Sequence, residues 1–229
     1  MSRTRIVAGG GRAVEVAPER LAGWFERFGA GHGGVRHTVL AADRVVVTAE
    51  DGAVAEVAVP FGGLVGEPLG DEPHEAPGLA IEPLLRHVLA PRRIGLLLVR
   101  LGGHSVGVVH DGRIEVSSTD RRQVHGRNKA GGWSQQRFAR RREGQARQAL
   151  QAAAEDAVRV LAPRLGELDA VVLGGDRQAL DALRADRRLA GVLALAEPRV
   201  LDVPEPRRSV LDDAAERARA VEIVVRPAD

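Results

Sequence analysis

The residues best suited to chemistry lie in one glycine-rich segment, from His125 to Arg142. Paired glycines such as Gly131 and Gly132 let a backbone enter a tight space and adopt positive φ angles. They precede a predicted helix start, where unpaired N–H groups and the helix dipole favour negative charge. Such a loop can enter a phosphate-rich cavity with a polar side chain at its tip. The polar candidates are Asn128, Gln135 and Gln136.

Positive charge is concentrated around the same segment. Residues 121–147 include nine basic residues and one acidic residue, whereas the rest of the chain has 24 basic and 30 acidic residues. A basic block on an otherwise acidic protein is expected when the partner is a polyanion. A solvated helix face is the alternative explanation. The basic residues are Arg121, Arg122, Arg127, Lys129, Arg137, Arg140, Arg141, Arg142 and Arg147.

The order of these residues resembles the catalytic loop of the eukaryotic and archaeal class I release factors, whose pattern is HGRGGQSALRFARLR. The opening HGR is matched by residues 125–127, the glycine pair by Gly131 and Gly132, and the serine by Ser134. The start of the following helix is matched by Arg137, Phe138, Ala139, Arg140 and Arg142. The resemblance covers residues 92–220, where strands, hairpin and helices are expected in the order of that family's central domain.

The segment departs from the release-factor pattern at the catalytic glutamine. Asn128, Lys129 and Ala130 are inserted before the glycine pair, and Trp133 stands where the family has its glutamine. Glutamines follow two and three residues later, at Gln135 and Gln136. This arrangement, AGGWSQQRFARRRE, is similar to the actinobacterial branch of the Vms-like release factors, the VLRF group, which is implicated in freeing nascent chains from stalled ribosomes. The N-terminal part does not resemble a stop-codon-reading domain, which favours rescue over ordinary termination.

The resemblance implies hydrolysis of the ester that joins a nascent peptide to the 3′ adenosine of tRNA, in the peptidyl-transferase centre of the ribosome. A glutamine amide takes up no proton near neutral pH, so its expected role is to orient water, while a backbone N–H stabilises the developing oxyanion. The expected catalytic residues are Gln135, Gln136, Gly131 and Gly132. The expected RNA-binding residues, which contact rRNA or peptidyl-tRNA, are Arg127, Lys129, Trp133, Arg137, Arg140 and Arg141.

Two other functions remain open from the sequence. Relatives of release factors exist that lack the catalytic tripeptide, occupy the ribosomal A site and promote subunit splitting. Trp133 in place of glutamine keeps this non-catalytic role open. A general RNA-binding protein is the third possibility, and strongly salt-dependent binding to free RNA would favour it.

The elements expected to position the loop form an α/β domain over residues 92–229. Ile94–Leu101 is a continuous apolar run, typical of a strand buried on both faces, and a hairpin follows with a turn at Asp111-Gly112. A long helix is expected from Ser134 to Leu161, where Pro163 ends it. Further strands are expected at 168–173, 199–203 and 221–225, with helices at 177–183 and 206–220.

Residues 1–91 are expected to form a small α+β domain. Strands are predicted at 13–16, 35–41, 44–48 and 53–59, and helices at 18–28 and 83–89. An acidic Gly/Pro linker is expected near residues 62–78, because this stretch has little hydrophobic periodicity.

Composition excludes several classes of site. The chain has no cysteine, which rules out disulfides, thiolate catalysis and Cys-ligated zinc. The seven histidines show no metal-ligand spacing, so neither a metal nor a cofactor is expected. A triad of His104, Ser105 and Asp111 is set aside, because no nucleophile elbow accompanies it. No apolar run or leader suggests a membrane partner, and we expect a cytoplasmic protein.

Overall fold

The computed structural model describes residues 4–7, 10–65, 72–100, 102–121 and 133–228, with the backbone alone at residue 121 and residues 133–143. The chain divides into two compact units. Unit 1 comprises Met1–Ala90 together with Arg219–Asp229, and unit 2 comprises Pro91–Ala218. The expected Gly-rich loop, residues 122–132, lies outside the described residues.

Unit 2 is built on a five-stranded mixed sheet in the order β11-β10-β7-β8-β9. Its strands are β7 (Arg93–Arg100), β8 (Gly103–His110), β9 (Arg113–Arg121), β10 (Ala170–Gly175) and β11 (Ala196–Leu201). The strands β7, β10 and β11 run parallel, whereas β8 and β9 form an antiparallel hairpin at one edge. Six consecutive residues of β7, from Ile94 to Val99, are buried. The expected α/β sheet with an edge hairpin is therefore confirmed.

Helices cover both faces of this sheet. They are α3 (Trp133–Leu161), η2 (Ala162–Glu167), α4 (Arg177–Leu183), η3 (Arg187–Leu189), α5 (Ala190–Ala194) and α6 (Arg208–Arg219). Successive strand residues point to opposite faces. Val106 and Val108 of β8 pack in one core cluster with alanines of α3, and a Cβ added at Gly107 between them would meet Leu211 of α6. The helices α3 and α6 therefore lie on opposite faces.

Local signals account for several ends of these helices. The side chain of Asp176 accepts a hydrogen bond from the backbone N–H of Gln178 at 2.9 Å, so it caps α4 as expected. Pro163 lies at the start of η2, directly after α3 ends. The short helices η3 and α5 were not expected, because residues 187–194 offer too few turns for helical periodicity to show.

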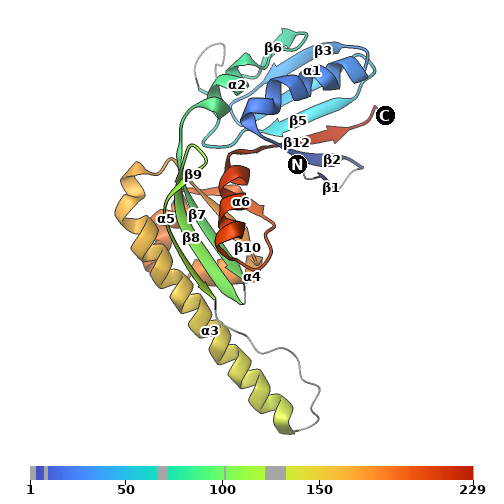
Figure 1. Ribbon diagram of the computed structural model, residues 1–229. Helices are drawn as coiled ribbons and strands as arrows, with labels where there is room; N and C mark the ends of the chain where they lie inside the picture. Colours follow the sequence, from blue (N-terminus) through green and yellow to red (C-terminus); the bar gives the residue numbers. More distant parts are fainter. Residues whose placement is uncertain (1–3, 8–9, 66–71, 101, 122–132, 229) are drawn as a thin grey trace. The chain divides into compact units, whose positions relative to one another are not determined.

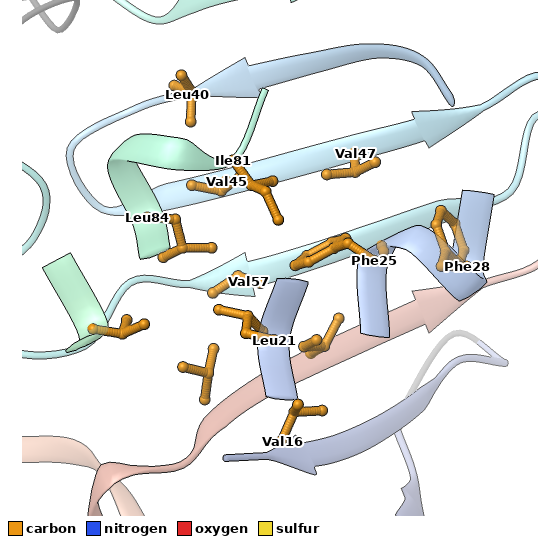
Figure 2. Close-up of a cluster of buried hydrophobic side chains, with 14 of the residues drawn as sticks. Val16, Leu21, Phe25, Phe28, Leu40, Val45, Val47, Val57, Ile81 and Leu84 are labelled. Carbon is orange, nitrogen blue, oxygen red and sulfur yellow. The ribbon is translucent and has the colours of Figure 1, made fainter. Parts of the chain in front are cut away.

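Unit 1 is a seven-stranded sheet in the order β1-β2-β12-β5-β4-β3-β6. Its elements are β1 (Thr4–Ile6), β2 (Arg12–Val16), η1 (Pro18–Arg20), α1 (Leu21–Gly31), β3 (Val35–Leu40), β4 (Arg44–Ala49), β5 (Val54–Ala58), β6 (His74–Pro77), α2 (Glu82–Leu89) and β12 (Val221–Arg226). Figure 2 shows the core between α1, α2 and the sheet, where Phe25 and Leu21 pack over Val45 and Val57.

Two features of unit 1 differ from expectation. The C-terminal strand β12 was assigned to the second domain, residues 92–229, but it lies between β2 and β5 of unit 1 and pairs antiparallel with both. The expected linker near residues 62–78 contains β6, which pairs with β3. Both strands pair with strands that are distant in the sequence, and local sequence patterns do not reveal such pairing partners.

Among the described residues, no helix combines the length and the hydropathy needed to cross a membrane.

Candidate functional site

Some of the expected site residues lie in the part of the chain that the structure describes, and others lie outside it. His125, Arg127, Lys129, Gly131 and Gly132 belong to the segment between β9 and α3 that lies outside it. The segment is bounded by Arg121, the last residue of β9, and Trp133, the first residue of α3. Their expected roles remain predictions.

The backbone of α3 carries the other expected site residues. Because α3 begins at Trp133, Gln135 and Gln136 both lie in its first turn, where backbone N–H groups have no partner inside the helix. Arg137, Arg140 and Arg141 follow within the next two turns. At about 100° per residue, Gln136 and Arg140 are about 40° apart around the helix axis, whereas Gln135 and Arg140 are about 140° apart.

The helix α3 is longer than the strands on which it packs. Its 29 residues span about 43 Å at 1.5 Å per residue. The nine residues of β9 span about 30 Å at 3.3 Å per residue. Figure 1 shows the N-terminal part of α3 extending past the ends of β8 and β9. The first turn, with both glutamines, is therefore carried away from the sheet of unit 2.

Small side chains attach the C-terminal half of α3 to the sheet. The buried residues described in this helix begin at Ala149 and are Ala149, Ala153, Ala154, Ala157, Val160 and Leu161. All of them except Ala149 pack in the core cluster that includes Val106 and Val108, on that face of the sheet. Alanines allow a helix to approach a sheet closely, but they interlock less than larger side chains do.

A polar network crosses the same interface. Asp156 of α3 accepts hydrogen bonds from His104 Nε2 of β8 at 2.9 Å and from Ser118 Oγ of β9 at 2.7 Å. Arg159 Nη2 donates to Asp156 Oδ1 at 2.6 Å and to Ser118 Oγ at 2.9 Å. We call these four residues the α3 clamp. It joins the helix that carries the glutamines to both strands of the hairpin.

The α3 clamp is charged, and its His104–Asp156 pair is largely shielded from solvent, whereas the side chain of Arg159 is exposed. The side chain of His104 is 3% exposed and that of Asp156 is 19% exposed. Burial raises the pKa of Asp156, but hydrogen bonds from Arg159, His104 and Ser118 outweigh this effect and lower the pKa to about 2. Asp156 is therefore ionised at neutral pH, and its carboxylate holds the network together.

The sequence did not predict this network. His104 and Asp156 are 52 residues apart, and neither belongs to a motif. The hydrophobic patterns of β8 and α3 do contain a hint of it. His104 shares a strand face with Val106 and Val108, and Asp156 interrupts the buried alanines of α3. A polar residue at an apolar position of each element suggests a buried pair, but the pattern does not say which strand faces the helix.

The described residues do not assemble a serine-type catalytic triad from His104, Ser105 and Asp111. His104 and Ser105 are consecutive in β8 and point to opposite faces of the sheet. Ser105 instead shares a hydrogen bond with Thr119 at 2.9 Å. Within the part of the chain that the structure describes, no group of three His, Asp or Glu side chains could hold a metal ion.

One curated protein is similar in sequence to part of this chain. The curated relative "Peptide chain release factor subunit 1" from Thermococcus onnurineus is 32% identical over 96 residues, which is 41% of this chain and 23% of that protein. The chain thus spans about a quarter of that relative.

Solved structures give weak superpositions. The archaeal translation termination factor aRF1 aligns over 76% of this chain and 51% of its own, at 17% identity and a TM-score of 0.44. Dom34 of S. cerevisiae, described as a translation termination-like factor involved in RNA quality control pathways and interacting with Hbs1, aligns over 94% of this chain and 69% of its own, at 9% identity and a TM-score of 0.35.

A family model supplies the decisive comparison. The model described as the Actinobacteria/chloroflexi VLRF1 release factor matches residues 92–224, more than half of the chain. The match includes all of the expected site residues, the α3 clamp and the sheet of unit 2. The chain therefore belongs to the Actinobacteria/chloroflexi VLRF1 release factor family.

Proposed function

We propose that this protein hydrolyses the ester bond of peptidyl-tRNA on stalled ribosomes in the cytoplasm and so releases the nascent chain. The observation that carries the proposal is the position of Gln135 and Gln136 in a release-factor family chain: both lie in the first turn of a helix that extends beyond its sheet. A projecting helix start is suited to enter a confined, RNA-lined centre.

The proposed reaction is attack of water on the ester carbonyl carbon. The bond between that carbon and the ribose oxygen breaks, the peptide leaves as a carboxylate and the tRNA regains its 3′ hydroxyl. One glutamine orients the water, while backbone N–H groups at Gly131, Gly132 or the start of α3 stabilise the oxyanion. Removing one such stabilising group typically slows the reaction by about 100-fold or more.

The proposed RNA contacts come from the basic block on either side of the glycine pair. Arg127, Lys129, Arg137, Arg140 and Arg141 contact phosphates of rRNA or tRNA, which fixes the orientation of the loop without reading sequence. Trp133 stacks on a base or ribose. Gln136 lies on nearly the same side of α3 as Arg140, and Gln135 on nearly the same side as Arg142, so the basic face does not select between them. The two glutamines are about 100° apart around the helix axis, and we expect only one of them to face the ester.

The test is peptide release from purified stalled ribosomal complexes that carry labelled peptidyl-tRNA. We expect one of the two variants Gln135→Ala and Gln136→Ala to slow release by about 100-fold and to leave ribosome binding unchanged. Gln148→Ala, at an exposed position of the same helix, is the matched control and should release at the wild-type rate.

The outcomes separate the proposal from its alternative. A large loss of release in only one of the two glutamine variants would support hydrolysis and identify the catalytic glutamine. Wild-type protein that binds ribosomes but releases no peptide would contradict hydrolysis. It would favour a non-catalytic factor that occupies the A site or splits subunits, the role suggested by Trp133 at the position of the family's catalytic glutamine.

A further inference from the structure

The first turn of α3 lies far from the contacts that hold the helix. Gln136 is 20 residues before Asp156, which is about 30 Å along an α-helix. A change of about 10° in the direction of α3 at the clamp would move Gln136 by about 5 Å. A displacement of about 1 Å can slow a positioned reaction by about 100-fold. Release therefore requires that the direction of α3 be tightly fixed.

The apolar part of the interface fixes this direction weakly. Four of the six buried residues described in α3 are alanines, whose short side chains permit small rotations and slides against the sheet. The α3 clamp is directional by contrast, because Asp156 bonds to two neighbouring strands at once, at 2.9 Å to His104 and 2.7 Å to Ser118.

We propose that His104 is a positioning residue that acts through Asp156: it fixes the direction of α3 on the sheet and so sets where Gln135 and Gln136 are presented to the ester. The inference rests on the proposed hydrolase function. A polar pair with as little solvent exposure as His104 and Asp156 is often replaceable by apolar side chains without loss of stability, so its benefit here is geometric specificity.

The test separates positioning from stability with a pair of variants. His104→Leu alone leaves the charge of Asp156 short of one partner and lowers the unfolding temperature. In the double variant His104→Leu/Asp156→Leu the uncompensated charge is gone, so we expect stability to recover. Release should nevertheless stay at least about tenfold slower in kcat, with little change in the KM for ribosomal complexes.

Two further variants serve as controls. His104→Gln keeps an N–H donor near the position of Nε2 and should restore most of the release rate. Ser105→Ala removes the hydrogen bond that the buried Ser105, the adjacent residue of β8, shares with Thr119 on the face away from α3. It should lower stability without changing kcat beyond the loss of folded protein.

A distance measurement without ribosomes tests the same inference. The chain has no native cysteine, so spin labels can be placed through Arg147→Cys on α3 and Arg113→Cys on β9, both exposed in unit 2. We expect a narrow distance distribution in the wild-type background and a broader or shifted one in His104→Leu/Asp156→Leu. If the double variant fails to fold, the distance distributions of His104→Leu and His104→Gln can be compared instead.

The results distinguish failure of the inference from failure of the proposed function. An unchanged distance distribution in the Leu variants, or release that recovers together with the unfolding temperature, would overturn the positioning role. Wild-type protein that releases no peptide would overturn the hydrolase. In that case, a distance distribution that is narrow in wild type and broader in the Leu variants would still support a role for His104 in fixing the direction of α3.

Discussion

Asp156 is the residue at which α3, β8 and β9 are joined. Its carboxylate accepts hydrogen bonds from one side chain of each strand and from Arg159 of its own helix. Hydrogen bonds to charged groups contribute about 1.5–3 kcal/mol each, more than neutral ones. Two of the three hydrogen bonds between the clamp residues of α3 and the hairpin therefore depend on this one ionised group, and the third runs from Arg159 to Ser118.

Acid should weaken this attachment in a predictable range. The pKa of Asp156 is lowered to about 2 in the folded state, against about 3.9 for an unfolded chain. A lowered pKa stabilises the fold above the unfolded value, and the contribution disappears as pH falls through the folded value. We expect Asp156→Asn to lower the free energy of unfolding by about 2 kcal/mol at pH 7, with the difference shrinking below about pH 4.

Denaturant unfolding of wild type and Asp156→Asn between pH 7 and pH 3 measures this difference. Glu155→Gln, one residue earlier on α3 and exposed, is the control and should show a much smaller change. A wild-type advantage that stays constant down to pH 3 would show that the carboxylate does not hold the network.

At the scale of elements, β10 passes into α4 through a turn that only glycine can make. Gly175 has a φ of +103°, and a Cβ there would lie 2.1 Å from the carbonyl oxygen of Val99 in the neighbouring strand. We expect Gly175→Ala to destabilise unit 2 by more than about 2 kcal/mol, since it adds backbone strain to a clash with main-chain atoms.

Gly144→Ala is the opposite case and the control for that measurement. Gly144 lies inside α3, and an added Cβ would meet nothing within 4 Å. Alanine in an exposed helix interior is favoured over glycine by about 0.5–1 kcal/mol. Thermal unfolding should therefore show a small gain in stability for Gly144→Ala, and an equal loss in both variants would contradict the argument.

The basic part of α3 predicts a salt-dependent interaction with RNA. If Arg140 and Arg141 contact phosphates, each change to glutamine should weaken ribosome binding and reduce the slope of log K against log salt by about 1. Arg177→Gln, at an exposed position of α4 outside the basic block, should leave the slope unchanged. Binding that is equally strong and equally salt-dependent on free RNA would favour a general RNA-binding protein.

At the scale of the whole molecule, the chain returns to unit 1 after completing unit 2. The strand β12, which follows unit 2, lies between β2 and β5, so the sheet of unit 1 contains strands from before and after unit 2 in the sequence. Without β12, that sheet would separate into the pair β1-β2 and the four strands β5-β4-β3-β6. Unit 1 therefore depends on residues that follow unit 2 in the sequence.

Fragments should behave accordingly. We expect residues 91–218 to unfold cooperatively as an isolated fragment, because they contain a complete sheet covered on both faces. Residues 1–90 alone should show no cooperative transition, and a fusion of 1–90 to 219–229 through a long flexible linker should regain one. Circular dichroism during heating measures each case; a cooperative 1–90 fragment would contradict the structural role of β12.

The sequence by itself determined most of what is local. The apolar run of β7, the turn at Asp111-Gly112 and the cap at Asp176 depend on residues close in the chain, and each was predicted at nearly its observed position. Family membership was also readable locally, because the order of residues in 125–142 is distinctive. The roles of the residues in that loop stay predictions, since residues 122–132 lie outside the described chain.

Only the tertiary structure decided which distant elements meet. The strand pattern of β12 is the same whether it joins unit 2 or lies between β2 and β5, because side-chain alternation does not encode the partner. The pairing of His104 with Asp156 likewise depends on which face of β8 lies under α3. Packing free energy is gained only when the complete set of elements is assembled, so these contacts appear in the fold and not in the local sequence.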